Sequence, residues 1–337
     1  AVRLALGDVT LPPDGEPTYL ARHSRFVRHM VNCSRGVASW IEDWRGGPSG
    51  RELVSLLKEK GFDSATIGVV GLDSQAAGEG EGFISYRMWS SILESLPQAT
   101  FVDVSKAYCD LVLVKSEEEL ALVRYSAWIG EKACETMLEV SKPGVSEGVI
   151  VGAIMNTIHS LGAYANNMIL HSGVDNPGWG SPSWFFQAQA PRILEKGDMV
   201  QAEIFQRYGG METQEQMSVA LQPVHPINRE CAVIARRSYD AGLKALRPGS
   251  TFKEVADAME APIVEAGCWY LTPLIHSMNP IVCTSQMVIG MERLPDREKY
   301  RGMKPMSIKG GDLVIQPGMV FEVEPSPAQG HHMVTLG

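Results

Sequence analysis

Two acidic residues, Glu203 and Glu324, stand at matching places in two similar stretches of the chain. Each lies six positions after a glycine that opens an apolar, strand-like run, Gly197 in the first stretch and Gly318 in the second. A pair of facing acids in an apolar sheet is costly unless a metal, a substrate or a shared proton compensates the charge. The repeat therefore predicts a catalytic site with these two residues on adjacent strands, their carboxylates about 4 to 8 Å apart.

The elements that must position these acids repeat as well. Lys142-Pro143-Gly144 and Arg247-Pro248-Gly249 each precede a segment with helical apolar periodicity, which ends near residues 163 and 267 respectively. From the long helix expected after Ser116, the segments read as helix, strand pair, helix, helix, strand pair. This order predicts an α+β domain with antiparallel strands.

A smaller unit precedes this domain. Helical spacing is found over 50–60 and 86–96, and strand-like runs over 65–72, read as a buried strand, and 100–104. The capping box at 116–119 then opens a long helix. We therefore expect a small α/β domain over 1–115 and the catalytic domain over 116–337, each with one incomplete end.

Composition narrows the classes of function. The 337 residues carry a formal net charge of −9, which argues against a nucleic-acid partner. No apolar run reaches the roughly 20 residues that span a bilayer, so no membrane partner is expected. The six cysteines lack C-x-x-C spacing, which indicates reduced thiols in a cytoplasmic protein rather than a zinc knuckle or a disulfide framework. The glycine-rich piece 76–82 is expected to be a surface loop.

Several motifs occur in an order that resembles the creatinase and aminopeptidase P family, M24. They are Lys115 to Glu119, the Lys142-Pro143-Gly144 stop, Ser172-Gly173 with Asn176, Gly197-Asp198, His276, and Pro317 to Pro325. The resemblance implies a pita-bread catalytic domain, which is a duplicated α+β unit, preceded by a small α/β creatinase-type domain. Because the family commonly builds its site at a dimer interface, it also implies a homodimer.

The metal ligands of the family are only partly present. Its peptidases hold two metal ions with two Asp, a His and two Glu. The resemblance puts Glu203 and Gln214 at the two Asp positions, His276 and Glu324 at the His and the first Glu, and the last Glu near or beyond Gly337. A neutral amide cannot bridge two cations as a carboxylate does, so no metal cofactor is expected. This agrees with a metal-free or metal-poor branch of the family that includes creatinase and ectoine hydrolase.

The expected activity is that of a metal-independent hydrolase of a small molecule, acting at a C–N bond of amide or amidine type. Glu203, or Glu215 at the spacing of a creatinase Glu, would orient or deprotonate water, and His276 would pass a proton to the leaving nitrogen. Glu324 would bind a cationic group or share a proton with Glu203. The catalytic His of creatinase has no counterpart between 176 and 192, so creatine is a poor candidate.

Five further residues are candidates for substrate binding. The aromatic loop 176–186 holds Trp179 and Trp184, which would stack on an aromatic or cationic substrate or else tuck the loop into the core. His171 beside it is a reserve general base. Glu322 shares the facing of Glu324, unless it pairs with a neighbouring Arg, and His332 either faces the site or is solvated.

The sequence also allows two other functions. One is a metal-dependent lyase or Xaa-Pro peptidase with a single divalent ion at Glu203, His276 and Glu324. The other is a non-catalytic binding module on a degenerate peptidase fold. Family relatives of that kind carry basic or long acidic extensions, and this sequence shows none.

Overall fold

The computed structural model describes residues 7–10, 12–21, 42–46, 50–72, 84–175 and 179–337. The glycine-rich piece 76–82 and Asn176 lie outside these ranges. The chain forms two compact units, Ala1–Gln75 with Glu79–Tyr108, and Ala76–Gly78 with Cys109–Gly337. The division falls within helix α4 (Ser105–Leu113). None of the described helices is long and apolar enough to cross a membrane.

The described part of the first unit contains two small sheets and two helices before α4. Strand β2 pairs antiparallel with β1 and parallel with β3, and β4 pairs parallel with β5. The two helices bury Val54, Leu57, Ile92 and Leu96 against each other and against β4 and β5. The helices and strands predicted over 50–104 are confirmed, whereas the prediction that 65–72 is a buried strand is wrong, because Thr66 and Gly68 of β4 are exposed. The bounds are β1 Gly7–Thr10, β2 Thr18–Ala21, β3 Asp43–Gly46, α2 Gly50–Glu59, β4 Thr66–Val69, α3 Tyr86–Ser95 and β5 Thr100–Asp103.

Capping boxes open helices in both halves of the second unit. The Ser116 hydroxyl accepts from the backbone N–H of Glu119 and the Glu119 carboxylate accepts from that of Ser116, so the predicted capping box is confirmed. Thr251 and Glu254 repeat the arrangement. The helices of this unit are α5 Glu117–Val140, α6 Glu147–Ser160, α7 Pro226–Ala245 and α8 Phe252–Glu265, with short 3-10 turns η1 Ser183–Phe185, η2 Met291–Arg293 and η3 Arg297–Tyr300.

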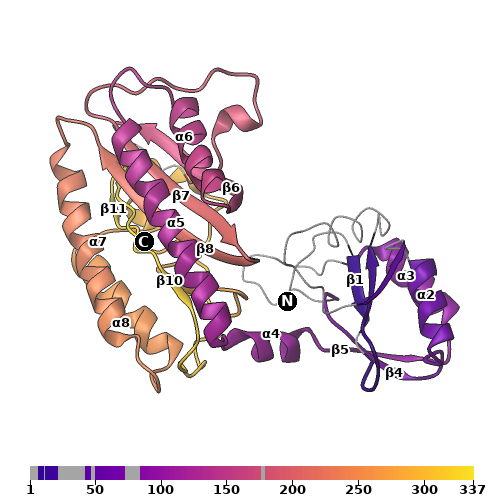
Figure 1. The fold of residues 1–337 in the computed structure, drawn as a ribbon. Coiled ribbons are helices and arrows are strands. Elements are labelled where there is room, and N and C mark those ends of the chain that lie inside the picture. The colour runs from indigo at the N-terminus through magenta and orange to yellow at the C-terminus, as the bar shows by residue number, and fades with distance from the viewer. Residues whose placement is uncertain (1–6, 11, 22–41, 47–49, 73–83, 176–178) are drawn as a thin grey trace. The chain divides into compact units, whose positions relative to one another are not determined.

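A three-stranded antiparallel sheet of long strands carries the first half. Strands β6 (Tyr164–Gly173), β7 (Met199–Tyr208) and β8 (Met211–Ala220) lie in the order β6-β7-β8. The β7–β8 turn is Gly209-Gly210, and both glycines have positive φ, at 58° and 85°. Helices α5 and α6 cover one face of this sheet (Figure 1), so one set of alternating side chains is buried among apolar groups: Met168, Leu170, Val200, Ala202, Ile204 and Val219.

The second half pairs α7 and α8 with shorter strands. β9 (Ile275–Ser277) runs antiparallel to β10 (Phe321–Val323), and β11 (Ala328–Gln329) to β12 (His332–Met333). Their core includes Phe252, Met259 and Ile275. The predicted duplicated α+β layout is confirmed. Among the described cysteines, Cys134, Cys231, Cys268 and Cys283 are free thiols.

Candidate active site

The face of the sheet that points away from α5 and α6 is polar at its centre. Glu203 is paired with Ile169 on one side and with Gln216 on the other. Alternation along each strand puts Gln201 and Gln214 on the same face of the sheet as Glu203 and Gln216. All four polar side chains are buried, and Glu203 is only 5% exposed. One face of the sheet therefore carries a row of buried polar groups, whereas the opposite face carries aliphatic groups.

The amide of Gln216 joins the two acids of the sequence repeat. Its nitrogen donates to Oε2 of Glu324 and also hydrogen-bonds Glu203. The neighbours of β7 in its sheet are β6 and β8, whereas Glu324 directly follows β10, which pairs with β9. The prediction that Glu203 and Glu324 lie on adjacent strands is therefore wrong, because Glu324 lies outside the sheet that contains β7.

His276 lies on β9 in a setting that requires two ring protons. Its Nδ1 is 3.0 Å from the carbonyl of Ser277, to which only an N–H can donate. Its Nε2 is 3.1 Å from Oε1 of Glu324 and 3.2 Å from Oε1 of Gln214, and both of these oxygens are acceptors. Burial lowers the pKa of His276, but Glu324, the Ser277 carbonyl and Glu212 together leave that pKa raised. The imidazolium and Glu324 form a buried ion pair.

Three carboxyls of the site hold protons more tightly than usual. Burial raises the pKa of Glu324, although its charge interaction and hydrogen bond with His276 oppose the shift. Burial, then Glu324 and then Glu212 raise the pKa of Glu203 well above its ordinary value, although hydrogen bonds from Gln216 and Trp179 oppose the shift. Burial and the neighbouring acids do the same to the pKa of Glu322. The described residues contain no ion pair for Glu322, so the Arg partner considered for it is not present. Titration of the site is therefore shared among several acids and one imidazole.

The residues that the structure places together do not fit a metal centre. Gln214 occupies the position where a bridging carboxylate would be needed, and its oxygen faces His276 instead. Within the described ranges no three His, Cys, Asp or Glu side chains converge as ligands of one ion would. Glu203, His276 and Glu324 do not form such a set, because Gln216 lies between the two carboxyls.

Glu215, the alternative water-activating residue, lies on the opposite face of the sheet from Glu203. The alternation that turns Glu203 and Gln216 one way turns Glu215 toward α5, where it accepts a hydrogen bond from the Gln206 amide. A side chain on Gly130 of α5 would overlap its carboxyl group. Glu215 and Glu203 therefore cannot act on the same atom of a substrate.

The predicted aromatic residues divide between two places. Trp179 hydrogen-bonds Glu203 and packs beside Trp269 and Met291, so it belongs to the carboxyl site. Trp184 instead donates at 3.3 Å to Oε2 of Glu147, at the start of α6.

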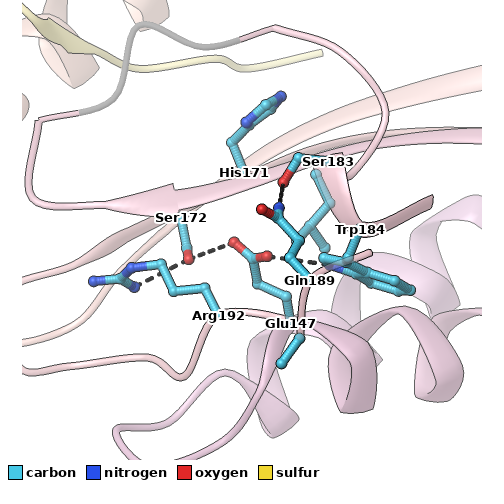
Figure 2. Close-up of a pocket in the computed structure, with 9 residues that line it drawn as sticks. Glu147, His171, Ser172, Ser183, Trp184, Gln189 and Arg192 are labelled. Atoms are coloured by element: carbon cyan, nitrogen blue, oxygen red, sulfur yellow. Dashed lines mark hydrogen bonds between the residues drawn. The ribbon is translucent and has the colours of Figure 1, made fainter. Parts of the chain in front are cut away.

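Trp184 and Glu147 line a separate cavity of about 340 Å³ (Figure 2). There Ser172 donates to Glu147 at 2.6 Å and Arg192 donates to Ser172 at 3.1 Å. His171 also lines this cavity but is turned away from Ser172 and Glu147 in Figure 2.

His332 lies apart from the carboxyls. Its ring stacks on that of His225 with centroids 4.0 Å apart, at the start of α7. Burial, and after it His225, lower the pKa of His332. This placement does not bring it together with Glu203 or Glu324.

The sequence analysis missed Gln201, Gln216, Glu212 and Glu147. A signal for the first three exists, because a two-residue turn at Gly209-Gly210 fixes the register of β7 against β8. Counting outward from that turn puts 212, 214 and 216 on the face of Glu203. Glu147 could not be found in this way, because its partners Ser172 and Trp184 come from β6 and η1, which are distant in the sequence.

Replacing Glu215 with Gln should flatten the dependence of stability on pH. Burial raises the pKa of Glu215 to about 8, from an unfolded value near 4.5. The native state therefore binds the extra proton between these values, and its stabilising effect, full below pH 4.5, is lost as pH rises through 8. Calorimetric melting at a series of pH values should give the same midpoint for both proteins near pH 4.5 and a higher one for the variant above pH 8. Parallel curves would show that Glu215 is ionised in the native state.

Comparison with known proteins places this arrangement in a family. The profile described as Metallopeptidase family M24 matches residues 121–335. The curated relatives include the uncharacterized peptidase YqhT of Bacillus subtilis, 24% identical over 72% of this chain and 63% of its own length. They also include creatinase of a Bacillus species, 22% identical over 64% and 50%, and Xaa-Pro dipeptidase of Pyrococcus furiosus, 22% identical over 73% and 64%. The chain thus spans half to just under two thirds of these relatives.

Solved structures agree on the fold. The prolidase from Pyrococcus furiosus superposes with a TM-score of 0.69 at 17% identity, covering 98% of this chain and 85% of that one. The expected pita-bread fold is thereby confirmed. At this identity the likeness is one of fold, and the side chains of the site have to be read from the chain itself.

Proposed function

The chain belongs to the metallopeptidase family M24, and from that premise we propose that it is a hydrolase that cleaves a C–N bond of amide or amidine type in a small molecule, without a metal ion. The observation that supports this most is the Gln216 amide, which joins the Glu203 carboxyl to the Glu324–His276 ion pair. One group of the site can take a proton and another can give one, as acid–base hydrolysis requires.

In the proposed reaction the ionised Glu203 accepts a proton from water while the water oxygen bonds to the carbon of the scissile bond. His276 then transfers its Nε2 proton to the leaving nitrogen as the C–N bond breaks. Glu324 keeps that imidazole protonated and oriented before the step. Because the pKa of Glu203 is raised, the active form of the base increases as pH rises, until His276 loses its proton.

Metal content is the first test of this proposal. Purified protein is expected to hold less than one transition-metal ion per chain, and chelators should leave turnover unchanged, because Gln214 stands where a bridging carboxylate would be needed. Elemental analysis together with turnover before and after dialysis against a chelator would check both points. Two tightly held ions per chain would contradict a metal-free mechanism.

A second candidate is an Xaa-Pro peptidase, favoured by the relative named Xaa-Pro dipeptidase. A panel that contains Xaa-Pro dipeptides, simple amides and amidines, assayed with and without added divalent metal, separates the two. Metal-stimulated release of proline would support the peptidase. Metal-independent release of ammonia or an amine from the other substrates would support the hydrolase proposed here.

The expected homodimer remains a proposal drawn from the family. Light scattering of the purified protein gives its mass directly, and a mass equal to one chain would contradict it. The cytoplasmic location, which was expected from the cysteine pattern, also remains a proposal.

A further inference from the structure

Two cysteines of the second unit lie in contact with each other. Cys231 is on α7, which packs side by side with α8 (Figure 1), and Cys268 follows shortly after the end of α8. The Cys231 thiol donates a hydrogen bond to the sulfur of Cys268. Two sulfurs must come together in this way before they can form a disulfide, whose S–S bond is about 2.05 Å long. The fold therefore brings these two thiols within reach of one another.

The β11–β12 hairpin contacts both sulfurs. The side-chain amide of Gln329 donates to Sγ of Cys268 at 3.5 Å. Sγ of Cys231 lies 3.9 Å from the carbonyl oxygen of His332. Gln329 and His332 are paired residues of β11 and β12, so the two cysteines approach the same place on this hairpin. These contacts are independent of the bond between the thiols and indicate the same juxtaposition.

Three groups favour the ionised form of Cys268. They are the Cys231 thiol and the Gln329 amide, which donate to its sulfur, and the Arg293 guanidinium, which also donates to the Cys268 carbonyl at 2.6 Å. The hydrogen bond from Cys231, together with the other two groups, outweighs burial and lowers the pKa of Cys268. The same bond, and after it burial, raises the pKa of Cys231. Because the thiolate is the nucleophilic form of cysteine, Cys268 is the sulfur that attacks, while Cys231 keeps its proton.

Burial restricts the oxidant that can react with this pair. Cys231 is 0% exposed and Cys268 is 1% exposed. A peptide disulfide such as glutathione disulfide is too bulky to bring its sulfur against a thiolate that is enclosed in this way. Hydrogen peroxide is little larger than water and reacts directly with a thiolate. The pair is therefore suited to a small peroxide rather than to thiol–disulfide exchange.

We propose that Cys231 and Cys268 are a redox pair that hydrogen peroxide converts to a disulfide. The Cys268 thiolate attacks one peroxide oxygen, so an S–O bond forms, the O–O bond breaks, and the hydroxide that leaves takes up the proton that Cys268 had released. The Cys231 sulfur then bonds to the Cys268 sulfur as the S–O bond breaks, and the leaving hydroxide takes the Cys231 proton as water. The two thiols lose two electrons in total, and the peroxide is reduced to two molecules of water. The proposal does not depend on the hydrolase activity.

Peptide mapping of the intact protein without reductant tests the proposal, before and after treatment with hydrogen peroxide. Once the remaining thiols are blocked with an alkylating reagent, the treated protein should yield a linked peptide that contains Cys231 and Cys268. Dithiothreitol should release the two parts. Oxidation of other cysteines without this linkage, or survival of both thiols in peroxide, would overturn the proposal.

Cys231→Ser separates the roles of the two sulfurs. Ser keeps a hydroxyl that can donate to Cys268, but it cannot form the disulfide, so Cys268 should be oxidised to the sulfinic acid instead. Cys283→Ser is the matched control, because Cys283 is also buried but hydrogen-bonds Ser277. It should give the same linked peptide as the parent. A Cys268 that stays reduced in Cys231→Ser would overturn its role as the attacking sulfur.

Denatured parent protein provides a control that does not require any variant to fold. In urea the contact between the thiols is lost, so peroxide should give mixed linkages among the six cysteines. Equal selectivity for the Cys231–Cys268 linkage in folded and denatured protein would overturn a role for the fold. Glutathione disulfide should leave Cys268 of the folded protein unmodified, and a mixed disulfide there would overturn the assignment of a small peroxide as the oxidant.

Discussion

Replacing Glu203 with Gln is expected to lower kcat by about 10² to 10⁴ while the fold stays intact. Gln keeps the shape of the side chain and can still accept a hydrogen bond from Trp179, but it cannot take a proton from water. The thermal midpoint should match that of the parent at acidic pH, where Glu203 is protonated, and exceed it at higher pH, where ionised Glu203 meets Glu324 and Glu212.

Turnover per folded molecule and thermal midpoint, measured together on a substrate identified from the panel, check this expectation. Glu215→Gln is the matched comparison, since it makes the same change on the opposite face of the sheet and should leave kcat within about twofold. A destabilised but fully active Glu203→Gln protein would show that Glu203 is a structural residue. A large loss of kcat in Glu215→Gln alone would assign water activation to the other acid.

Replacing Gly130 with Ala is expected to destabilise the protein strongly. Gly130 lies on α5 where the helix passes closest to β8, and an added methyl group would overlap the carboxyl of Glu215 and the amide of Gln206. Gln206 is held in turn by Ser126 and Thr213, so these side chains cannot simply swing away. Overpacking of this kind costs about 1 to 3 kcal/mol. The midpoint of thermal unfolding should therefore fall by about 3 to 10 °C.

Gly152→Ala is the control for that experiment. Gly152 lies on α6, and nothing comes within 4 Å of a methyl group added there. The better helix propensity of Ala should raise stability by up to about 1 kcal/mol. Equal midpoints for the two variants would show that α5 can move away from the sheet, so that the contact between Gly130 and Glu215 does not fix its position.

The sequence predicted those structural features that depend on a few consecutive residues. The capping box at Ser116 and Glu119 depends on a few consecutive residues, and it is found as expected. The repeat singled out Glu203 and Glu324, and both side chains are buried in the structure; their role as catalytic residues stays a prediction.

What could not be predicted depends on how the two halves dock. Nothing near Glu324 in the sequence indicates that Gln216 would stand between it and Glu203. The facing of Glu215 is a different case, since counting from the Gly209-Gly210 turn puts it on the face opposite Glu203. One residue of register reverses the direction of every side chain on a strand.

The Gln216 amide bonds to a carboxylate 108 positions further along the chain, and Gln201 reaches across 132 positions to Met333. Contacts of such sequence separation carry a large loop-closure cost and tend to form late in folding. Until then Glu203 and Glu322 are hydrated and, at neutral pH, ionised. When the halves close, burial raises their pKa values and shifts both carboxyls toward the protonated form. Completion of the site is therefore coupled to proton binding, and it is favoured as the solution becomes more acidic.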